Sequence, residues 1–164
     1  MRKQAHGMHV LVAGVLVAAV PVATWGLMGQ DDAQGLPPSQ LDHAYEPLAI
    51  PAGVQTALGI GALLLAAAAL VLLVRAWRRG TFDRRWWQVL GPLMVAGLIV
   101  GAGWRVLTAG VVGANIGAGL VVLFGAPVVV ALALWAAGRG VWLALHRSDR
   151  GPGAGVGAPS GSPS

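Results

Sequence analysis

Four long apolar segments constrain this chain more than any other feature. Each approaches or exceeds the roughly 20 residues with which a helix crosses the hydrocarbon core of a bilayer. Because 56% of the 164 residues are hydrophobic and only 10% are charged, too few polar side chains remain to cover a water-facing surface. We therefore expect an all-α integral membrane four-helix bundle. Its predicted spans are about residues 8–29, 53–76, 86–107 and 115–138.

The segments between the spans are predicted from length and composition. The apolar stretch from Trp86 to Trp135 is too long for one helix at 1.5 Å per residue, so it must turn, and the glycines of Leu107 to Asn115 favour a turn there. The polar stretch from Gln30 to Ala52 is expected to be a loop outside the bilayer. Residues 1–150 are thus predicted to form one transmembrane domain, and the Gly/Pro/Ser tail 151–164 is predicted to be disordered.

The first apolar segment follows a basic head and can also be interpreted as a secretory signal peptide. The apolar region of a signal peptide lasts about 7–15 residues and ends at a small-x-small site. Here the run is longer, and its best site, Val17-Ala18-Ala19, lies inside it. We therefore expect an uncleaved first helix. Pro21 in this helix and Pro127 in the fourth remove backbone donors and predict bends.

Charge is distributed unevenly over the predicted loops. If the amino terminus is cytoplasmic, all of the lysines and arginines except Arg105 lie on the cytoplasmic side. The positive-inside rule then predicts that both termini are cytoplasmic. The acidic side chains between Asp31 and Glu46 fall in the outer loop, although acidic residues carry little weight in this rule.

Arginine and tryptophan side chains mark the predicted ends of the spans. Indole rings prefer the headgroup zone, and a basic side chain near an anionic surface contributes about 1 kcal/mol. The stretch RAWRRGTFDRRWW, Arg75 to Trp87, is therefore interpreted as a topology anchor, with a docking surface for a cytoplasmic partner or a specific lipid as the alternative. The predicted membrane-interface anchors are Arg75, Arg78, Arg79, Arg84, Arg85, Trp77, Trp86, Trp87, Trp104, Arg105, Trp135 and Arg139.

Arg105 is the one ionisable side chain within a long apolar run. Counted from Gln88, it lies about 26 Å along the third helix, near the outer edge of a core roughly 30 Å thick. From there it can snorkel to the outer headgroups. A pairing with the acidic loop and a buried substrate contact are the alternatives.

The sequence offers little chemistry for catalysis or cofactor binding. There is no cysteine, which excludes disulfides, thiolate metal sites and thiol nucleophiles. The predicted spans carry no acidic side chain or histidine near mid-membrane, and serine-hydrolase, metalloprotease and phosphate-loop motifs are missing. Asp42, His43 and Glu46 in the outer loop are the best metal candidates, but a polar loop is the more ordinary interpretation. We expect no catalytic centre, no cofactor and no metal.

Small residues at a spacing of four predict close helix packing. Gly97 with Gly101, Gly113 with Gly117, and Gly14 with Ala18 form such pairs. They let helix backbones approach where lipid supplies no hydrophobic drive. We expect them to serve packing within the chain rather than dimerisation.

The stretch RRGTFDRRWWQVLGPLMVAG, Arg78 to Gly97, resembles the uncharacterised family of bacterial four-helix membrane proteins called domain of unknown function 2975. In that family a basic end of the second span is followed by a Gly-x-Pro-Phe-like turn, and Gly80 and Phe82 stand at the matching positions, with Thr81 in place of the proline. We expect Gly80 to end one helix, Thr81 or Asp83 to cap the next, and Phe82 to pack against the bundle. WAAGRGVWLAL, Trp135 to Leu145, is similar to the family's carboxyl-terminal end. The resemblance implies an integral membrane location and no established activity.

These observations favour a small multi-pass membrane protein without a catalytic centre. Its expected location is the bacterial cytoplasmic membrane, and its expected partners are the lipid bilayer and either a membrane or cytoplasmic protein or a second copy of the chain. The alternative is a small transporter or a pore-forming oligomer. Nucleic acid is not expected as a partner despite the pI near 11.4, because the arginines flank apolar spans instead of forming a basic face on a soluble domain.

Overall fold

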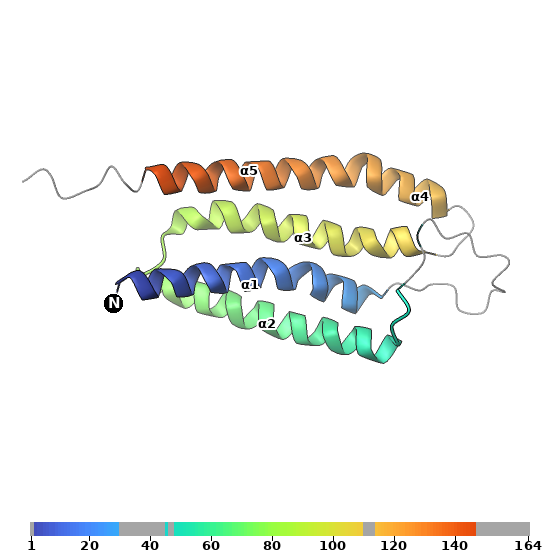
Figure 1. The fold of residues 1–164 in the computed structure, drawn as a ribbon, viewed down its shortest axis with the longest axis horizontal. Coiled ribbons are helices and arrows are strands. Elements are labelled where there is room, and N and C mark those ends of the chain that lie inside the picture. Colours follow the sequence, from blue (N-terminus) through green and yellow to red (C-terminus); the bar gives the residue numbers. More distant parts are fainter. Residues whose placement is uncertain (1, 30–44, 46–47, 110–113, 147–164) are drawn as a thin grey trace, which may run out of the picture.

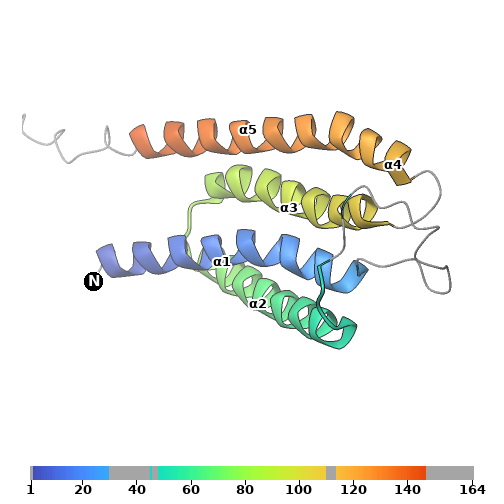
Figure 2. The same cartoon turned by 45° about the vertical axis from the view of Figure 1, so that its right-hand side comes forward.

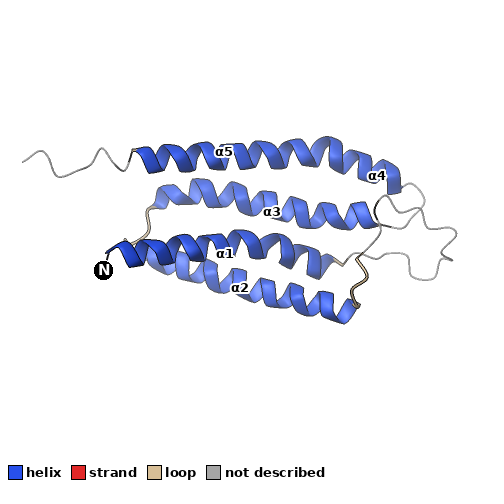
Figure 3. Cartoon of the chain, viewed as in Figure 1, coloured by secondary structure: helices blue, strands red, loops and turns tan. Residues whose placement is uncertain are grey.

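The computed structural model describes residues 2–29, 45, 48–109 and 114–146, and every regular element in these ranges is helical (Figure 3). Four helices are long and apolar enough to cross a membrane: Gly7–Met28, Ala52–Arg78, Arg84–Thr108 and Ile116–Leu145. This confirms the predicted all-α protein with four apolar spans. The elements are α1 (Arg2–Met28), α2 (Ala52–Arg78), the 3-10 turn η2 (Arg84–Trp86), α3 (Trp87–Thr108), α4 (Ala114–Leu120), the π-helical turn η3 (Val121–Gly125) and α5 (Ala126–Leu145).

The helices form an open bundle, arranged as a row in the order α2, α1, α3, α5 (Figures 1 and 2). α1 packs on α2 and on α3, and α3 packs on α5. Because α2 and α3 follow each other in the chain but α1 lies between them, the turn that joins them passes the amino-terminal part of α1 (Figure 1). This crossing creates a hollow between α1 and α3.

The contact between α1 and α2 depends on two glycines that face each other, Gly26 and Gly59. A Cβ atom added to Gly59 would lie 2.6 Å from the carbonyl carbon and 2.8 Å from the Cα of Gly26. Such distances leave no room for any side chain, so the two backbones touch. Sequence reasoning missed this pair because each glycine stands on a different helix.

The contact between α1 and α3 uses the predicted pair Gly97 and Gly101. A Cβ on Gly101 would lie 2.7 Å from the carbonyl oxygen of Pro21 and 2.6 Å from Cβ of Thr24, and one on Gly97 would lie 3.0 Å from Cδ of Pro21. The expected packing within the chain is therefore confirmed for this pair.

The other two small-residue pairs differ from it. No atom lies within 4 Å of a Cβ on Gly14, so the prediction that Gly14 and Ala18 pack a helix within the chain is wrong, and both line a hollow instead. A Cβ on Gly117 would lie 3.3 Å from Cγ1 of Val106, at the contact of α4 with α3. Gly113 lies outside the described residues.

The helix ends differ from the predicted ones in two places. α1 already begins at Arg2, because Arg, Lys, Gln and Ala in the basic head are good helix formers. The fourth span continues to Leu145 instead of ending near 138, because Arg139 makes contacts along the helix surface and does not terminate it. The turn predicted at Leu107 to Asn115 agrees with the end of α3 at Thr108 and the start of α4 at Ala114.

A bend was predicted at Pro127, and the structure has a π-helical turn just before this residue. Val121–Gly125 forms a π-helical turn, in which the N–H of Ala126 donates to the carbonyl of Val121. Proline has no N–H for the preceding turn, and a widened turn is a common accommodation within a long helix. α1, by contrast, continues through Pro21.

Candidate functional site

The turn between α2 and α3 is fixed by backbone hydrogen bonds. Gly80 adopts a positive φ of 69°, which favours glycine, and its N–H donates to the Trp77 carbonyl over 2.9 Å. The Thr81 N–H donates to the Ala76 carbonyl over 3.0 Å, which completes the paired bonds of a Schellman C-cap. The Thr81 hydroxyl donates to the same carbonyl over 2.9 Å. Gly80 thus ends α2, as the sequence predicted.

The next two residues connect this turn to the helices on either side. The Asp83 carboxylate accepts a hydrogen bond of 2.9 Å from the Arg85 N–H and caps η2. The Phe82 side chain is buried, with its ring centroid 6.0 Å from that of His9 on α1 and 6.2 Å from that of Trp87 on α3. The predicted capping and the predicted burial of Phe82 are both confirmed.

The arginines of this segment remain on the surface. All five side chains are exposed, and they surround the ends of α2 and η2, so we call this part of the molecule the arginine end. Five arginines and one aspartate leave it with a formal charge of +4. Trp77 is exposed, whereas Trp86 and Trp87 are half-buried. The members of the arginine end are Arg75, Trp77, Arg78, Arg79, Asp83, Arg84, Arg85, Trp86 and Trp87.

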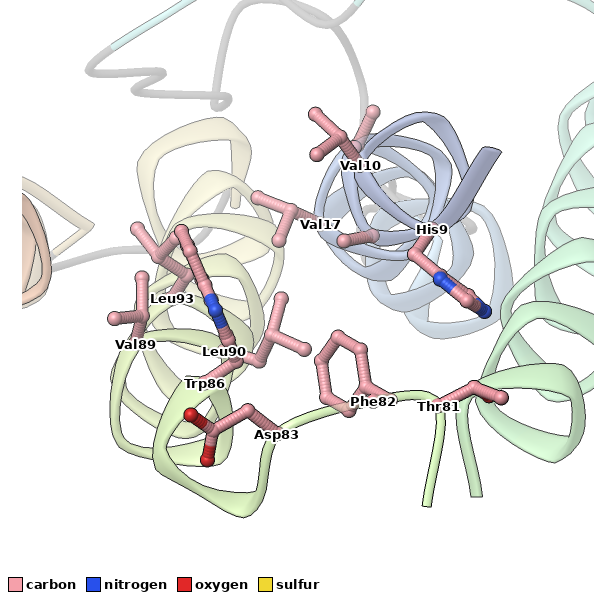
Figure 4. A pocket seen from close by; sticks show the side chains of 13 residues that line it. His9, Val10, Val17, Thr81, Phe82, Asp83, Trp86, Val89, Leu90 and Leu93 are labelled. Atoms are coloured by element: carbon pink, nitrogen blue, oxygen red, sulfur yellow. The ribbon is translucent and has the colours of Figure 1, made fainter. Parts of the chain in front are cut away.

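A cavity of about 430 Å³ lies between α1 and α3 beside the arginine end. Figure 4 shows Val10 and Val17 of α1 on one side, Leu90 of α3 on the other, and Phe82 of the turn between them. The lining is almost entirely apolar, and polar groups occur only near the turn and at His9. The cavity is lined by His9, Val10, Ala13, Gly14, Val17, Ala18, Thr81, Phe82, Asp83, Trp86, Val89, Leu90 and Leu93.

A second, more open hollow of about 780 Å³ adjoins the first. It is lined by Trp77, Asp83, Arg84, Arg85, Trp87 and Gln88. Asp83 lines both hollows, so the apolar cavity and the arginine-lined hollow meet at this residue. An apolar chamber beside a cationic one is suited to a molecule with an apolar tail and an anionic head.

Arg139 is the predicted anchor of the fourth span, and its contacts lie along the protein surface. Its guanidinium donates a hydrogen bond to the side-chain oxygen of Gln88 on α3, and it stands 4.9 Å from the ring centroid of Trp142. Trp135 is exposed. Ala136 and Leu143, the buried residues of α5, pack with Val89 of α3, and the bond to Gln88 joins the same two helices.

Arg105 and Trp104 lie at the carboxyl-terminal end of α3, at the opposite end of the bundle from the arginine end. Arg105 donates a hydrogen bond to the carbonyl of Met28, the last residue of α1. The Trp104 ring centroid is 6.1 Å from that of Tyr45, whose N–H donates to the Leu107 carbonyl over 3.1 Å. The bond from Arg105 to the Met28 carbonyl was not predicted, because the sequence does not show that the third helix ends beside the first.

Two buried polar side chains also make hydrogen bonds that the sequence did not predict. Gln55 is 5% exposed, and its side-chain amide donates to the Trp25 carbonyl over 3.3 Å, next to the crossing of α1 and α2. The fully buried Thr108 hydroxyl donates to the Trp104 carbonyl over 2.9 Å at the end of α3. The sequence showed polar residues near helix ends but not their partners.

The arrangement therefore defines an all-helical protein with four apolar helices, an arginine end and an adjoining apolar cavity. No protein-family model matches this chain, and neither does any curated protein or solved structure with which it was compared. Asp42, His43 and Glu46 lie outside the described residues. Among the residues that are described, no group of three metal-type side chains comes together.

Proposed function

We propose that this chain is a four-span protein of the bacterial cytoplasmic membrane that works by interaction and has no catalytic centre. The observation that carries the proposal is the arginine end, where five exposed guanidinium groups stand beside helices with exposed apolar faces. The bacterial membrane is inferred from the family resemblance of Arg78 to Gly97 and Trp135 to Leu145. The partner of the arginine end is an anionic surface at the cytoplasmic face.

The proposed orientation places both termini and the arginine end in the cytoplasm. It is supported by the positive-inside rule. The fold also supports it, because the ends of α2 and α5 and the start of α1 lie at the same end of the bundle (Figure 1). Because the chain has no cysteine, single cysteines can report it directly. In intact cells an impermeant thiol reagent should label Ser39→Cys and should spare Arg84→Cys and Ser148→Cys. The reverse pattern would contradict the orientation.

The proposed interaction can be tested with a photo-crosslinking residue at Arg79. The matched control is the same crosslinker at Gly61, an exposed position within α2 that belongs to no charged cluster. We expect Arg79 adducts that contain an anionic lipid or an acidic protein, and that diminish when the neighbouring arginines are replaced by glutamine. Adducts that are identical at both positions would show that the arginine end has no preference of its own.

A small transporter is the second candidate, and the π-helical turn Val121–Gly125 favours it. Such turns leave backbone groups with irregular pairing and occur often at functional sites. The test is solute flux into liposomes that contain the purified protein, with Pro127→Ala as the variant that restores a regular helix. Flux that changes with Pro127→Ala would support transport over interaction, whereas a panel of solutes without flux would remove this candidate.

A further inference from the structure

We propose that the cavity between α1 and α3 binds one acyl chain of an anionic phospholipid whose phosphate lies over Arg84 and Arg85. The inference deepens the proposed function and rests on it, because it names the ligand of the arginine end and the place of its tail. The occupant is argued from three properties of the cavity: its size, its lining and the charge beside it.

The size of the cavity favours a narrow occupant. A volume of about 430 Å³ lies within the range of small-molecule sites, roughly 300–1,000 Å³. The cavity lies between two neighbouring helices, α1 and α3, so its occupant must fit the space between them. An acyl chain is thin and flexible and needs no backbone hydrogen bonds.

The lining of the cavity matches a hydrocarbon tail. Val10, Val17 and Leu90 line its sides, and the ring of Phe82 lies between α1 and α3 (Figure 4). Gly14 and Ala18 widen the α1 side, and no atom lies within 4 Å of a Cβ placed on Gly14. A helix surface that uses small residues without packing another helix against them leaves space for a ligand.

The charge beside the cavity selects the head of the ligand. Arg84 and Arg85 belong to the same 3-10 turn as Trp86, which lines the cavity, and they line the adjoining hollow. Asp83 borders both hollows, but the five arginines outweigh its carboxylate and leave the arginine end with a net charge of +4. The arginines therefore attract a phosphate at the place where the tail enters the cavity. A zwitterionic phospholipid would bind there less well, because its head carries a cation of its own.

The experiment measures which lipids the full chain retains. The protein is released from nanodiscs that hold equal amounts of phosphatidylglycerol and phosphatidylcholine, and bound lipids are counted by native mass spectrometry. We expect one retained phosphatidylglycerol in preference to phosphatidylcholine. Gly14→Leu should lower this retention at least tenfold by occupying the cavity, whereas Gly61→Leu, also a glycine with no atom within 4 Å of an added Cβ, should leave it unchanged. Arg84→Gln with Arg85→Gln should lower the preference for phosphatidylglycerol by roughly 25-fold.

The possible failures separate the two proposals. If Gly14→Leu retains phosphatidylglycerol as the unmodified chain does, the cavity is not the binding site, while binding at the arginine end stands. If the unmodified chain shows no preference for phosphatidylglycerol, the lipid inference is overturned, and the interaction proposal then depends on a protein adduct at Arg79. A dimer that Gly14→Leu abolishes would identify a second copy as the occupant and overturn the inference. Circular dichroism of each variant confirms that it has folded.

Discussion

The guanidinium of Arg105 on α3 donates a hydrogen bond to the carbonyl of Met28, where α1 ends. The last carbonyl groups of a helix have no partner within it and carry the negative end of the helix dipole, so a cation placed there stabilises the helix. Arg105 thus joins the ends of two helices that are far apart in the sequence. A membrane-interface anchor would depend only on the charge of the arginine. The contact with Met28 also depends on where the guanidinium lies.

Replacement of Arg105 by glutamine is expected to destabilise the fold by about 1 kcal/mol, because a hydrogen bond from a charged donor is lost at a partly exposed site. The measurement is the free energy of unfolding during titration of micelles with a denaturing detergent. Arg78→Gln, which removes an exposed arginine at the arginine end, is the control and should change stability little. Equal losses in the two variants would show that Arg105 contributes only through charge.

Gly59 and Gly61 offer a comparison of two glycines in one helix. Gly59→Ala should destabilise the protein by about 1–3 kcal/mol, because the new methyl group meets the backbone of Gly26, which cannot move aside. Gly61→Ala should be neutral or stabilise by up to about 1 kcal/mol, since nothing lies within 4 Å of its Cβ and alanine favours the helix. Thermal unfolding in detergent measures both. A loss of stability in Gly61→Ala as large as that in Gly59→Ala would contradict the close contact of α1 and α2.

The features that could be predicted from the sequence are those that depend on neighbours in the chain. Hydropathy and length located the four spans, and the Gly80 turn and its Asp83 cap followed from local propensities. The contacts of Gly26 with Gly59 and of Arg105 with Met28 depend on which helices are adjacent. Because the four apolar spans have similar compositions, the sequence does not show which helices lie next to each other.

The candidate site illustrates the same division. The arginines and tryptophans were recognised as a group from the sequence, but the cavity beside them was not. It exists because α1 lies between α2 and α3 in the row, which brings His9 and Gly14 to the turn at Phe82. Whether the arginines and tryptophans act as membrane anchors stays a prediction.

The bond between Gln88 and Arg139 should hold the carboxyl-terminal part of α5 against α3. Gln88→Leu removes the acceptor, and the amides of residues 136–145 should then exchange hydrogen about fivefold faster, corresponding to a loss of about 1 kcal/mol. Gln88→Glu keeps an acceptor for the guanidinium and should retain slow exchange. Exchange measured by mass spectrometry in nanodiscs compares the variants, and equal rates in Gln88→Leu and the unmodified chain would show that apolar packing alone holds α5.

Asp83 is the one acidic side chain of the arginine end, and it performs two opposing tasks. Its carboxylate caps η2 through the Arg85 N–H, and it also places a negative charge where the two hollows meet. Asparagine is an equally good N-cap, so Asp83→Asn should preserve the turn while it removes the charge. Retention of phosphatidylglycerol should rise about fivefold, since one unit of charge near the surface is worth about 1 kcal/mol.

Varying the salt concentration shows whether Asp83→Asn acts through its charge or through the structure of the turn. Raising the ionic strength from about 0.15 M to 1 M shortens the screening length from about 8 Å to 3 Å, so the advantage of Asp83→Asn should shrink if it is electrostatic. Asp83→Ala removes both the charge and the cap, and should lose about 1 kcal/mol of stability that Asp83→Asn keeps. If Asp83→Asn lowers the retention of phosphatidylglycerol although the turn is intact, the negative charge of Asp83 does not oppose the bound head. The head position inferred from Arg84 and Arg85 would then be wrong.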